Sequence, residues 1–176
     1  LVEKPMALTL ESINAFDRAA FVAALGHLFE HSPWVADETW PRRPFRDAAH
    51  LHAELCATVR AAGAGRQLEL IRAHPDLAGR LAQQQQLTAA SAREQASAGL
   101  NALTAEELER FRQLNQAYRE RFGFPFVICA RLQARDTILA AMTVRLNQSP
   151  DVEFATALAE IEKIARIRLG DILTRS

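Results

Sequence analysis

The sequence predicts an all-α protein, a single-domain bundle of about eight helices, from three features. Apolar residues recur at helical spacing along most of the chain, and residues typical of helix ends separate these stretches. The one apolar run that fits a buried strand, GFPFVICA at 123–130, has no second strand candidate with which to pair. No linker is long enough to divide the chain. We expect one domain over residues 1–176, with 1–5 set apart because Met6 is a plausible true start.

Three helices are expected in the first part of the chain. Asp17 is a suitable N-cap for a helix that continues to about His31, shortly before Pro33. Two more helices are expected at 45–62 and 66–73, where apolar residues again recur at helical spacing.

The dipeptide His74-Pro75 marks the next boundary. A proline disfavours helical geometry at the residue before it and is itself suited to the first turn of a new helix. We therefore expect His74 in a bend and a short helix at 75–81. An imidazole displaced from a helix in this way can project into a cleft and exchange protons near neutral pH. The alternative is a histidine that only caps a helix end.

The remaining helices are expected in the second half. Thr104 and Glu107 have the spacing of a capping box, and Gly123 is suited to end the helix that they begin. We interpret Pro125 as the first turn of a buried helix. The expected helices cover residues 88–100, 104–123, 125–132, 136–146 and 150–173.

The composition is that of an ordinary globular chain. Of its 176 residues, 49% are hydrophobic and 24% are charged. A chain of this length and composition can bury a substantial core. Because 21 Lys and Arg balance 21 Asp and Glu, no general field attracts nucleic acid or anionic lipid. No apolar run approaches the roughly 18 residues of a spanning helix. We expect neither a nucleic-acid nor a membrane partner, and an anionic ligand must meet locally placed arginines.

The cysteines and the chain ends predict a cytoplasmic protein. Cys56 and Cys129 lie inside apolar stretches without the spacing of a zinc site or redox motif, so reduced core residues are expected in place of a disulfide. The first residues lack the basic-then-apolar order of a signal peptide. The last residues, TRS, do not resemble a peroxisomal SKL ending.

The segment HLFEH, with His27, Glu30 and His31, formally matches an inverted zinc-protease pattern of two helical histidines four residues apart. A catalytic zinc needs a third protein ligand, and Ser32 and Pro33 end the helix directly afterwards. We therefore expect no metal site. A zinc hydrolase and a non-catalytic helical interaction module stay open as alternative functions.

Three more polar residues are candidates for chemistry. Glu94 offers a carboxylate, although with Ser91 it also matches a capping box, in which it would only bind a backbone N–H. Arg168 falls on the apolar stripe of the last helix, where a charge needs an anionic partner, either a protein carboxylate or a ligand. Arg145 is a weaker candidate for that role and is expected at the surface. With His74, these residues predict a helical pocket for acid–base work on a small anion.

Long motifs distributed along the chain indicate a specific reaction. They are EHSPWVA at 30–36, HPDLAGR at 74–80, SAREQASAGL at 91–100, LNQAYRERFGFPFVICAR at 114–131 and EIEKIARIRL at 160–169. In this order and spacing the chain resembles the 2-oxo-4-hydroxy-4-carboxy-5-ureidoimidazoline (OHCU) decarboxylases over nearly its whole length. The resemblance implies the last step of urate breakdown, in which OHCU loses carbon dioxide and becomes (S)-allantoin.

The same resemblance implies roles for individual residues. His74 matches the catalytic histidine, which acts as proton donor, and Glu94 matches the essential carboxylate. The segment 126–130 matches one that contacts the substrate mainly through backbone groups, and Arg168 matches an arginine near the substrate. The implied substrate-binding residues are Pro75, Ser91, Ala92, Arg93, Glu94, Gln95, Phe126, Val127, Ile128, Cys129, Ala130 and Arg168.

The resemblance also implies the partners of the protein. The implied partners are a small anionic substrate and a second copy of the chain in a homodimer. Neither a metal nor an organic cofactor is implied. A neutral surface and amphipathic helices are equally compatible with a monomer.

Overall fold

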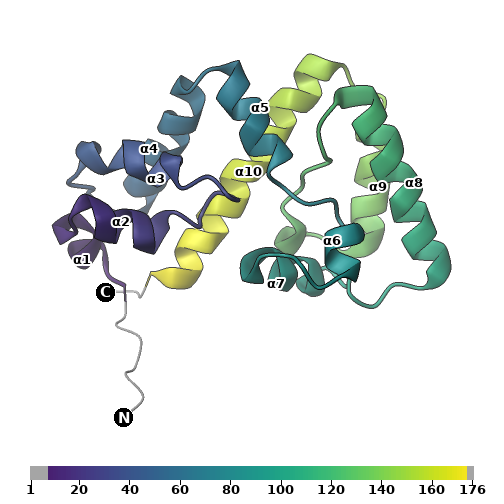
Figure 1. Ribbon diagram of the computed structural model, residues 1–176, viewed down its shortest axis with the longest axis horizontal. Helices are drawn as coiled ribbons and strands as arrows, with labels where there is room; N and C mark the ends of the chain where they lie inside the picture. Colours follow the sequence, from purple (N-terminus) through teal and green to yellow (C-terminus); the bar gives the residue numbers. More distant parts are fainter. Residues whose placement is uncertain (1–7, 174–176) are drawn as a thin grey trace, which may run out of the picture. The chain divides into compact units, whose positions relative to one another are not determined.

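The computed structural model describes residues 8–173 (Figure 1), so the expected start at Met6 and the ending TRS lie outside the described residues. The chain divides into two compact units, one containing the residues up to Gln67 and from Glu162 onward, the other Leu68–Ile161. The regular elements in residues 8–173 are α-helices and short 3-10 helices, apart from one isolated bridge between Leu8 and Leu173. The all-α prediction is confirmed.

The first unit packs its short helices around buried aromatic and aliphatic side chains. Helix α3 contacts both α2 and α4, and Phe21, Leu25, Val35, Leu51 and Leu55 have no exposed surface. Its elements are α1 (Leu10–Ala15), α2 (Arg18–Leu25), α3 (Trp34–Thr39), η1 (Trp40–Arg42) and α4 (Ala48–Ala61).

The second unit is built around the long helix α8, which packs against α9, while α7 packs against the short helix η2. Phe111, Tyr118, Phe126, Ile138 and Met142 are buried in its core. Its elements are α6 (Arg80–Gln83), α7 (Ala89–Ser97), α8 (Ala105–Phe122), η2 (Ala130–Leu132) and α9 (Arg135–Arg145). The chain passes between the units within α5 (Ala64–Arg72) and α10 (Pro150–Ile172).

Local signals place several helix ends as predicted. The Asp17 side chain accepts a hydrogen bond from the backbone of Ala20, as an N-cap does. Thr104 and Glu107 form the expected capping box, and Gly123 ends α8 with φ of 75°, a left-handed conformation that glycine adopts without steric cost.

The predicted helix 17–31 is wrong at its end, because α2 stops at Leu25 and residues 26–31 form turns. His31 has φ of +46°, which a continuing helix does not allow. Leu28 and Phe29 are buried nevertheless. The turns also place the Glu30 carboxylate 2.9 Å from the Arg168 guanidinium.

Two further helix predictions are wrong. Residues 75–79 form a turn and α6 begins only at Arg80, because Ala78 has φ of +50° and donates its backbone N–H to the Gln95 side chain. Residues 125–129 are extended and buried without being a strand, and only the short helix η2 follows them. The sequence did not predict α1 or α3.

Cys56 and Cys129 are buried thiols and are not joined by a disulfide, as expected. No helix in residues 8–173 is both long and apolar enough to cross a bilayer.

Candidate active site

Three of the predicted site segments belong to the second unit, where side chains connect them. The Gln95 amide on α7 accepts the backbone N–H of Ala78 at 2.9 Å and donates to the Asp76 carbonyl at 3.4 Å. This ties α7 to the loop that follows His74. The contact between α7 and η2 brings the same helix beside the end of segment 126–130.

His74 lies in a bend directly after α5, as predicted, and only 6% of its surface is exposed. Its Nδ1 is 3.0 Å from the Leu70 carbonyl oxygen in the last turn of α5. Because a carbonyl only accepts, Nδ1 must carry the hydrogen in this bond, and Nε2 is the nitrogen that gains and loses the proton. The ring therefore caps a helix, as the alternative interpretation expected.

The loop after His74 is fixed by two side chains from α8. Arg119 donates from Nε to the Asp76 carboxylate at 2.8 Å, and the buried Asn115 amide donates to the Leu77 carbonyl at 2.9 Å. Asn115 and Gln95 bond the backbone of residues 76–78, which no helix or sheet orders, and Arg119 holds the Asp76 side chain.

Helix α7 begins at Ala89, two residues before the SxxE motif. Thr88 is its N-cap, and its side chain accepts the Ser91 backbone N–H at 3.3 Å. Ser91 and Glu94 are therefore inside the helix, one turn apart, and the capping-box interpretation of the pair is wrong. Ser91 and Gln95 are buried, Glu94 is half-buried, and Ala92 and Arg93 are exposed.

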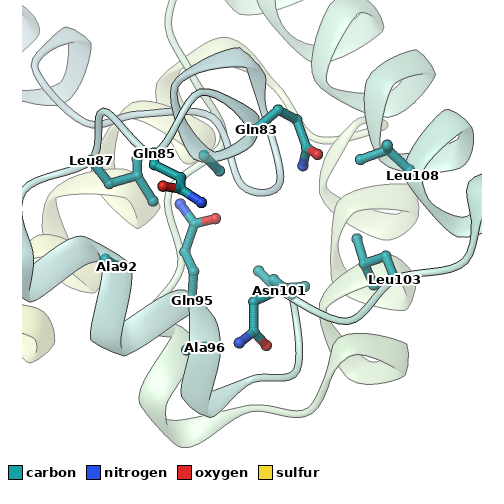
Figure 2. Close-up of a pocket in the computed structure, with 11 residues that line it drawn as sticks. Gln83, Gln85, Leu87, Ala92, Gln95, Ala96, Asn101, Leu103 and Leu108 are labelled. Atoms are coloured by element: carbon teal, nitrogen blue, oxygen red, sulfur yellow. The ribbon is translucent and has the colours of Figure 1, made fainter.

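One face of α7 borders a cavity of about 400 Å³ (Figure 2). Ala92, Gln95 and Ala96 line it from this helix, at the three- and four-residue spacing of one helix face. Side-chain amides of Gln83 and Asn101 share the lining with leucines (Figure 2). Glu94 is not among the described residues that line this cavity, so α7 directs Glu94 and Ala92 to different sides.

Segment 126–130 is buried throughout, and side chains take the place of a partner strand. Arg145 donates from Nη1 to the Val127 carbonyl at 2.8 Å, and the Cys129 backbone N–H donates to the Glu160 carboxylate at 2.9 Å. The Cys129 amide hydrogen, which was expected to face the substrate, is therefore already bound to protein.

The expectation of Arg145 at the surface is wrong. Its side chain is 11% exposed and its Nη2 lies 3.0 Å from the Glu153 carboxylate, which is fully buried. Its guanidinium carbon lies 4.2 Å from the centroid of the Phe126 ring. The negatively charged partner that Arg145 requires is therefore the Glu153 carboxylate of α10.

Arg168 belongs to the first unit and is also buried, with 4% of its surface exposed. Its Nη2 lies 2.9 Å from Glu30, and its Nη1 donates to the His27 carbonyl at 3.3 Å. Of the two partner types expected for this charge, the structure provides the protein carboxylate. Its contact with a substrate stays a prediction.

The zinc-type pattern HLFEH is not formed. Its residues lie in turns after α2, so His27 and His31 do not share the face of a helix. Glu30 is paired with Arg168, and the His31 side chain is 67% exposed. No group of three or more His, Cys, Asp or Glu side chains in the described part of the chain is placed to hold a metal ion.

Comparison with known proteins identifies the family. The model of the OHCU decarboxylase family matches residues 14–170, almost the whole chain. The chain belongs to the OHCU decarboxylase family. A Haloferax volcanii protein named 2-oxo-4-hydroxy-4-carboxy-5-ureidoimidazoline decarboxylase is 44% identical over 164 residues, 93% of this chain and 95% of that protein. A Mus musculus protein of the same name is 42% identical over 94% of this chain and 93% of its own length.

A solved structure supports the same relationship. The crystal structure of an (S)-allantoin synthase matches 96% of this OHCU decarboxylase family chain with a TM-score of 0.76 and 32% identity. The chain spans 55% of the length of that synthase.

Sequence reasoning missed four polar residues that support the candidate site of this OHCU decarboxylase family member. They are Asn115, Tyr118, Glu153 and Glu160, and each bonds another part of the second unit. A signal was available for the two glutamates. They lie seven positions apart on the helix that carries the apolar stripe, so they share a face.

Proposed function

We propose that the chain catalyses the decarboxylation of OHCU to (S)-allantoin and carbon dioxide, the last step of urate breakdown. The observation that carries this proposal is the near full-length match to relatives named for this activity, 44% identical over 93% of the chain in one case. The buried histidine in the bend adds chemical support, and Gln95 ties the loop that follows it to the helix of Glu94.

The reaction makes three demands on a protein. When the carboxylate leaves as carbon dioxide, its electron pair moves into the unsaturated ring, and an enol-like intermediate forms. The site must hold the carboxylate out of the ring plane, neutralise charge that develops on ring heteroatoms, and deliver a proton to one face of the ring. Since the ring itself accepts the electrons, acid–base side chains suffice, and no organic cofactor or metal is required by this chemistry.

His74 is proposed as the proton donor. Its Nδ1–H bond to Leu70 fixes the ring orientation and makes Nε2 the proton-exchanging atom. The ring also lies at the carbonyl end of α5, whose partial negative charge stabilises an imidazolium. A ring held this rigidly delivers its proton from one side, which accounts for a single enantiomer.

Glu94 and segment 126–130 are proposed to orient the substrate. Glu94 is half-buried on α7, one turn from the buried Ser91 and next to Gln95. Backbone groups of the buried segment offer hydrogen bonds in apolar surroundings, where each bond is electrostatically stronger than in water. Because Glu160 takes the Cys129 N–H, the donors to the substrate belong to the neighbouring residues. The other proposed contacts are Pro75, Ala92, Arg93 and Arg168.

A coupled assay tests the function. OHCU is generated in situ from urate, the purified protein is added with or without a chelator, and circular dichroism follows the allantoin formed. We expect rapid appearance of an optically active product in both arms. A product that forms no faster than in buffer and carries no optical activity contradicts the proposal, because spontaneous protonation reaches both faces of the ring. Loss of activity with the chelator contradicts the metal-free mechanism.

We also propose that the protein is cytoplasmic and forms a homodimer. Two buried cysteines without a disulfide are typical of a reducing compartment. The homodimer rests on the family resemblance, and light scattering of the purified chain tests it. A measured mass equal to that of one chain, 19.6 kDa, contradicts the dimer.

A further inference from the structure

A buried charged cluster lies behind the candidate substrate segment in the second unit. The Glu153 carboxylate of α10 has no exposed surface, and Arg145 of α9 approaches it with Nε at 3.2 and 3.1 Å from its two oxygens. The Tyr118 hydroxyl of α8 donates a short hydrogen bond to the same carboxylate. Three helices therefore contribute to one buried polar cluster.

The cluster contacts the first two residues of the substrate segment. Arg145 donates to the Val127 carbonyl and lies over the Phe126 ring. The Tyr118 ring packs edge-on against Phe126, with centroids 5.4 Å apart and planes at 88°. Both the backbone and the side chain of the segment are thus fixed at this end.

The other end of the segment is held by a second carboxylate of the same helix. Glu160 follows Glu153 by seven residues, which is two helical turns, and accepts the Cys129 backbone N–H at 2.9 Å. Two glutamates on one face of α10 therefore anchor the extended segment, Glu153 through Arg145 and Glu160 directly.

Stability alone does not explain this arrangement. A buried ion pair is often no more stabilising than apolar side chains of similar volume, because both charges lose their hydration. What directional polar groups add is a defined backbone geometry, which an unpaired extended segment does not possess by itself. A segment whose backbone groups bind a substrate needs a fixed backbone geometry of this kind.

We propose that Arg145, oriented by Glu153 and Tyr118, and Glu160 are positioning residues for decarboxylation, which set the backbone of residues 126–129 in the geometry that binds the substrate ring. This inference rests on the proposed function. None of the four side chains is assigned a contact with the substrate.

Glu160 provides the sharper test, because it is only half-buried and its replacement leaves the core intact. Glu160→Gln keeps an oxygen that accepts the Cys129 N–H, whereas Glu160→Ala does not. We expect Glu160→Gln to retain kcat/KM within about 3-fold and Glu160→Ala to lose about 10- to 100-fold, since small misplacements at a reacting centre have effects of this size.

The buried cluster is tested with paired substitutions. Arg145→Met alone leaves Glu153 buried without its guanidinium, so Arg145→Met/Glu153→Gln, which removes both charges, keeps the fold measurable. We expect this folded double variant to lose about 10- to 100-fold in kcat/KM. Arg112→Met is the control, because it breaks an exposed ion pair with Glu109 on α8 and should leave kcat/KM unchanged.

The enantiomeric excess of allantoin separates positioning from general stability. A loosely held ring is protonated on both faces, so Glu160→Ala and the double variant should give product of reduced optical purity, while Glu160→Gln and Arg112→Met should not. Folded variants with wild-type kcat/KM and optical purity overturn the inference and leave the proposed function standing. A wild-type protein without decarboxylase activity contradicts the proposed function itself, and the inference falls with it.

Discussion

Replacing Arg168 tests whether its buried charge serves the fold of the first unit. The guanidinium and the Glu30 carboxylate are 5% and 2% exposed, with 2.9 Å between them. Arg168→Met keeps much of the aliphatic volume and removes the cation. Removing one member of a buried pair costs about 3–5 kcal/mol, because the remaining charge stays out of water without its partner.

This cost is large enough to measure by thermal unfolding. For a chain of this length, 1 kcal/mol corresponds to roughly 2–4 °C, so Arg168→Met should lower Tm by about 6–20 °C. Far-UV circular dichroism follows the loss of helix. The double variant Glu30→Gln/Arg168→Met removes both charges, and we expect it to recover most of the lost stability.

The same variants separate the two roles considered for Arg168. A loss below about 0.5 kcal/mol, together with a raised KM, would refute a structural ion pair and identify the substrate as the partner of this charge. A lower Tm with unchanged KM in the folded protein supports the structural role and contradicts the predicted substrate contact.

Three further predictions concern the second unit and the thiol of the first. Gln95→Ala removes the partner of the Ala78 N–H in a buried loop, so the free energy of unfolding should fall by about 1–3 kcal/mol in urea titrations, and an unchanged value contradicts the bond. Glu94→Gln should lower kcat by about 100-fold without changing Tm, because a less well oriented substrate reacts more slowly, and wild-type turnover excludes its proposed role. Burial raises the pKa of the Cys56 thiol to about 12, and burial with the Glu153 hydrogen bond raises the pKa of Tyr118 above its ordinary value. The unfolded chain loses these protons at lower pH than the folded protein, so the free energy of unfolding should fall as pH rises above about 9, and a flat alkaline profile contradicts these shifts.

Local signals explain the parts of the fold that the sequence predicts. The Asp17 cap, the Thr104 and Glu107 box and the Gly123 C-terminus act between residues at most four positions apart. The proline after His74 likewise displaces that histidine from the helix through a clash with its direct neighbour. Such features need no knowledge of the rest of the chain.

The wrong predictions share the opposite property. The turn at 75–79 depends on Gln95, which bonds Ala78 from 17 positions away. The extended segment after Pro125 depends on Arg145, 18 positions beyond Val127. Its apolar composition fits a helix equally well until these distant donors are in place.

The candidate site divides in the same way. The motifs around His74 and Glu94 are visible as residues, and the sequence correctly excluded a helical position for the histidine. The network of Tyr118, Arg145 and Glu153 is not visible, because its members come from three helices that meet only in the folded unit. A charge on an apolar stripe indicates that a partner exists without naming it.

The proton-donor role of His74 is tested most directly by following optically active allantoin with His74→Asn beside the wild-type protein. Asparagine keeps a polar side chain at the bend and lacks a proton that exchanges near neutral pH. The proposed mechanism predicts a rate at least about 100-fold lower in a folded variant with wild-type Tm. A folded His74→Asn protein that forms (S)-allantoin at the wild-type rate contradicts it.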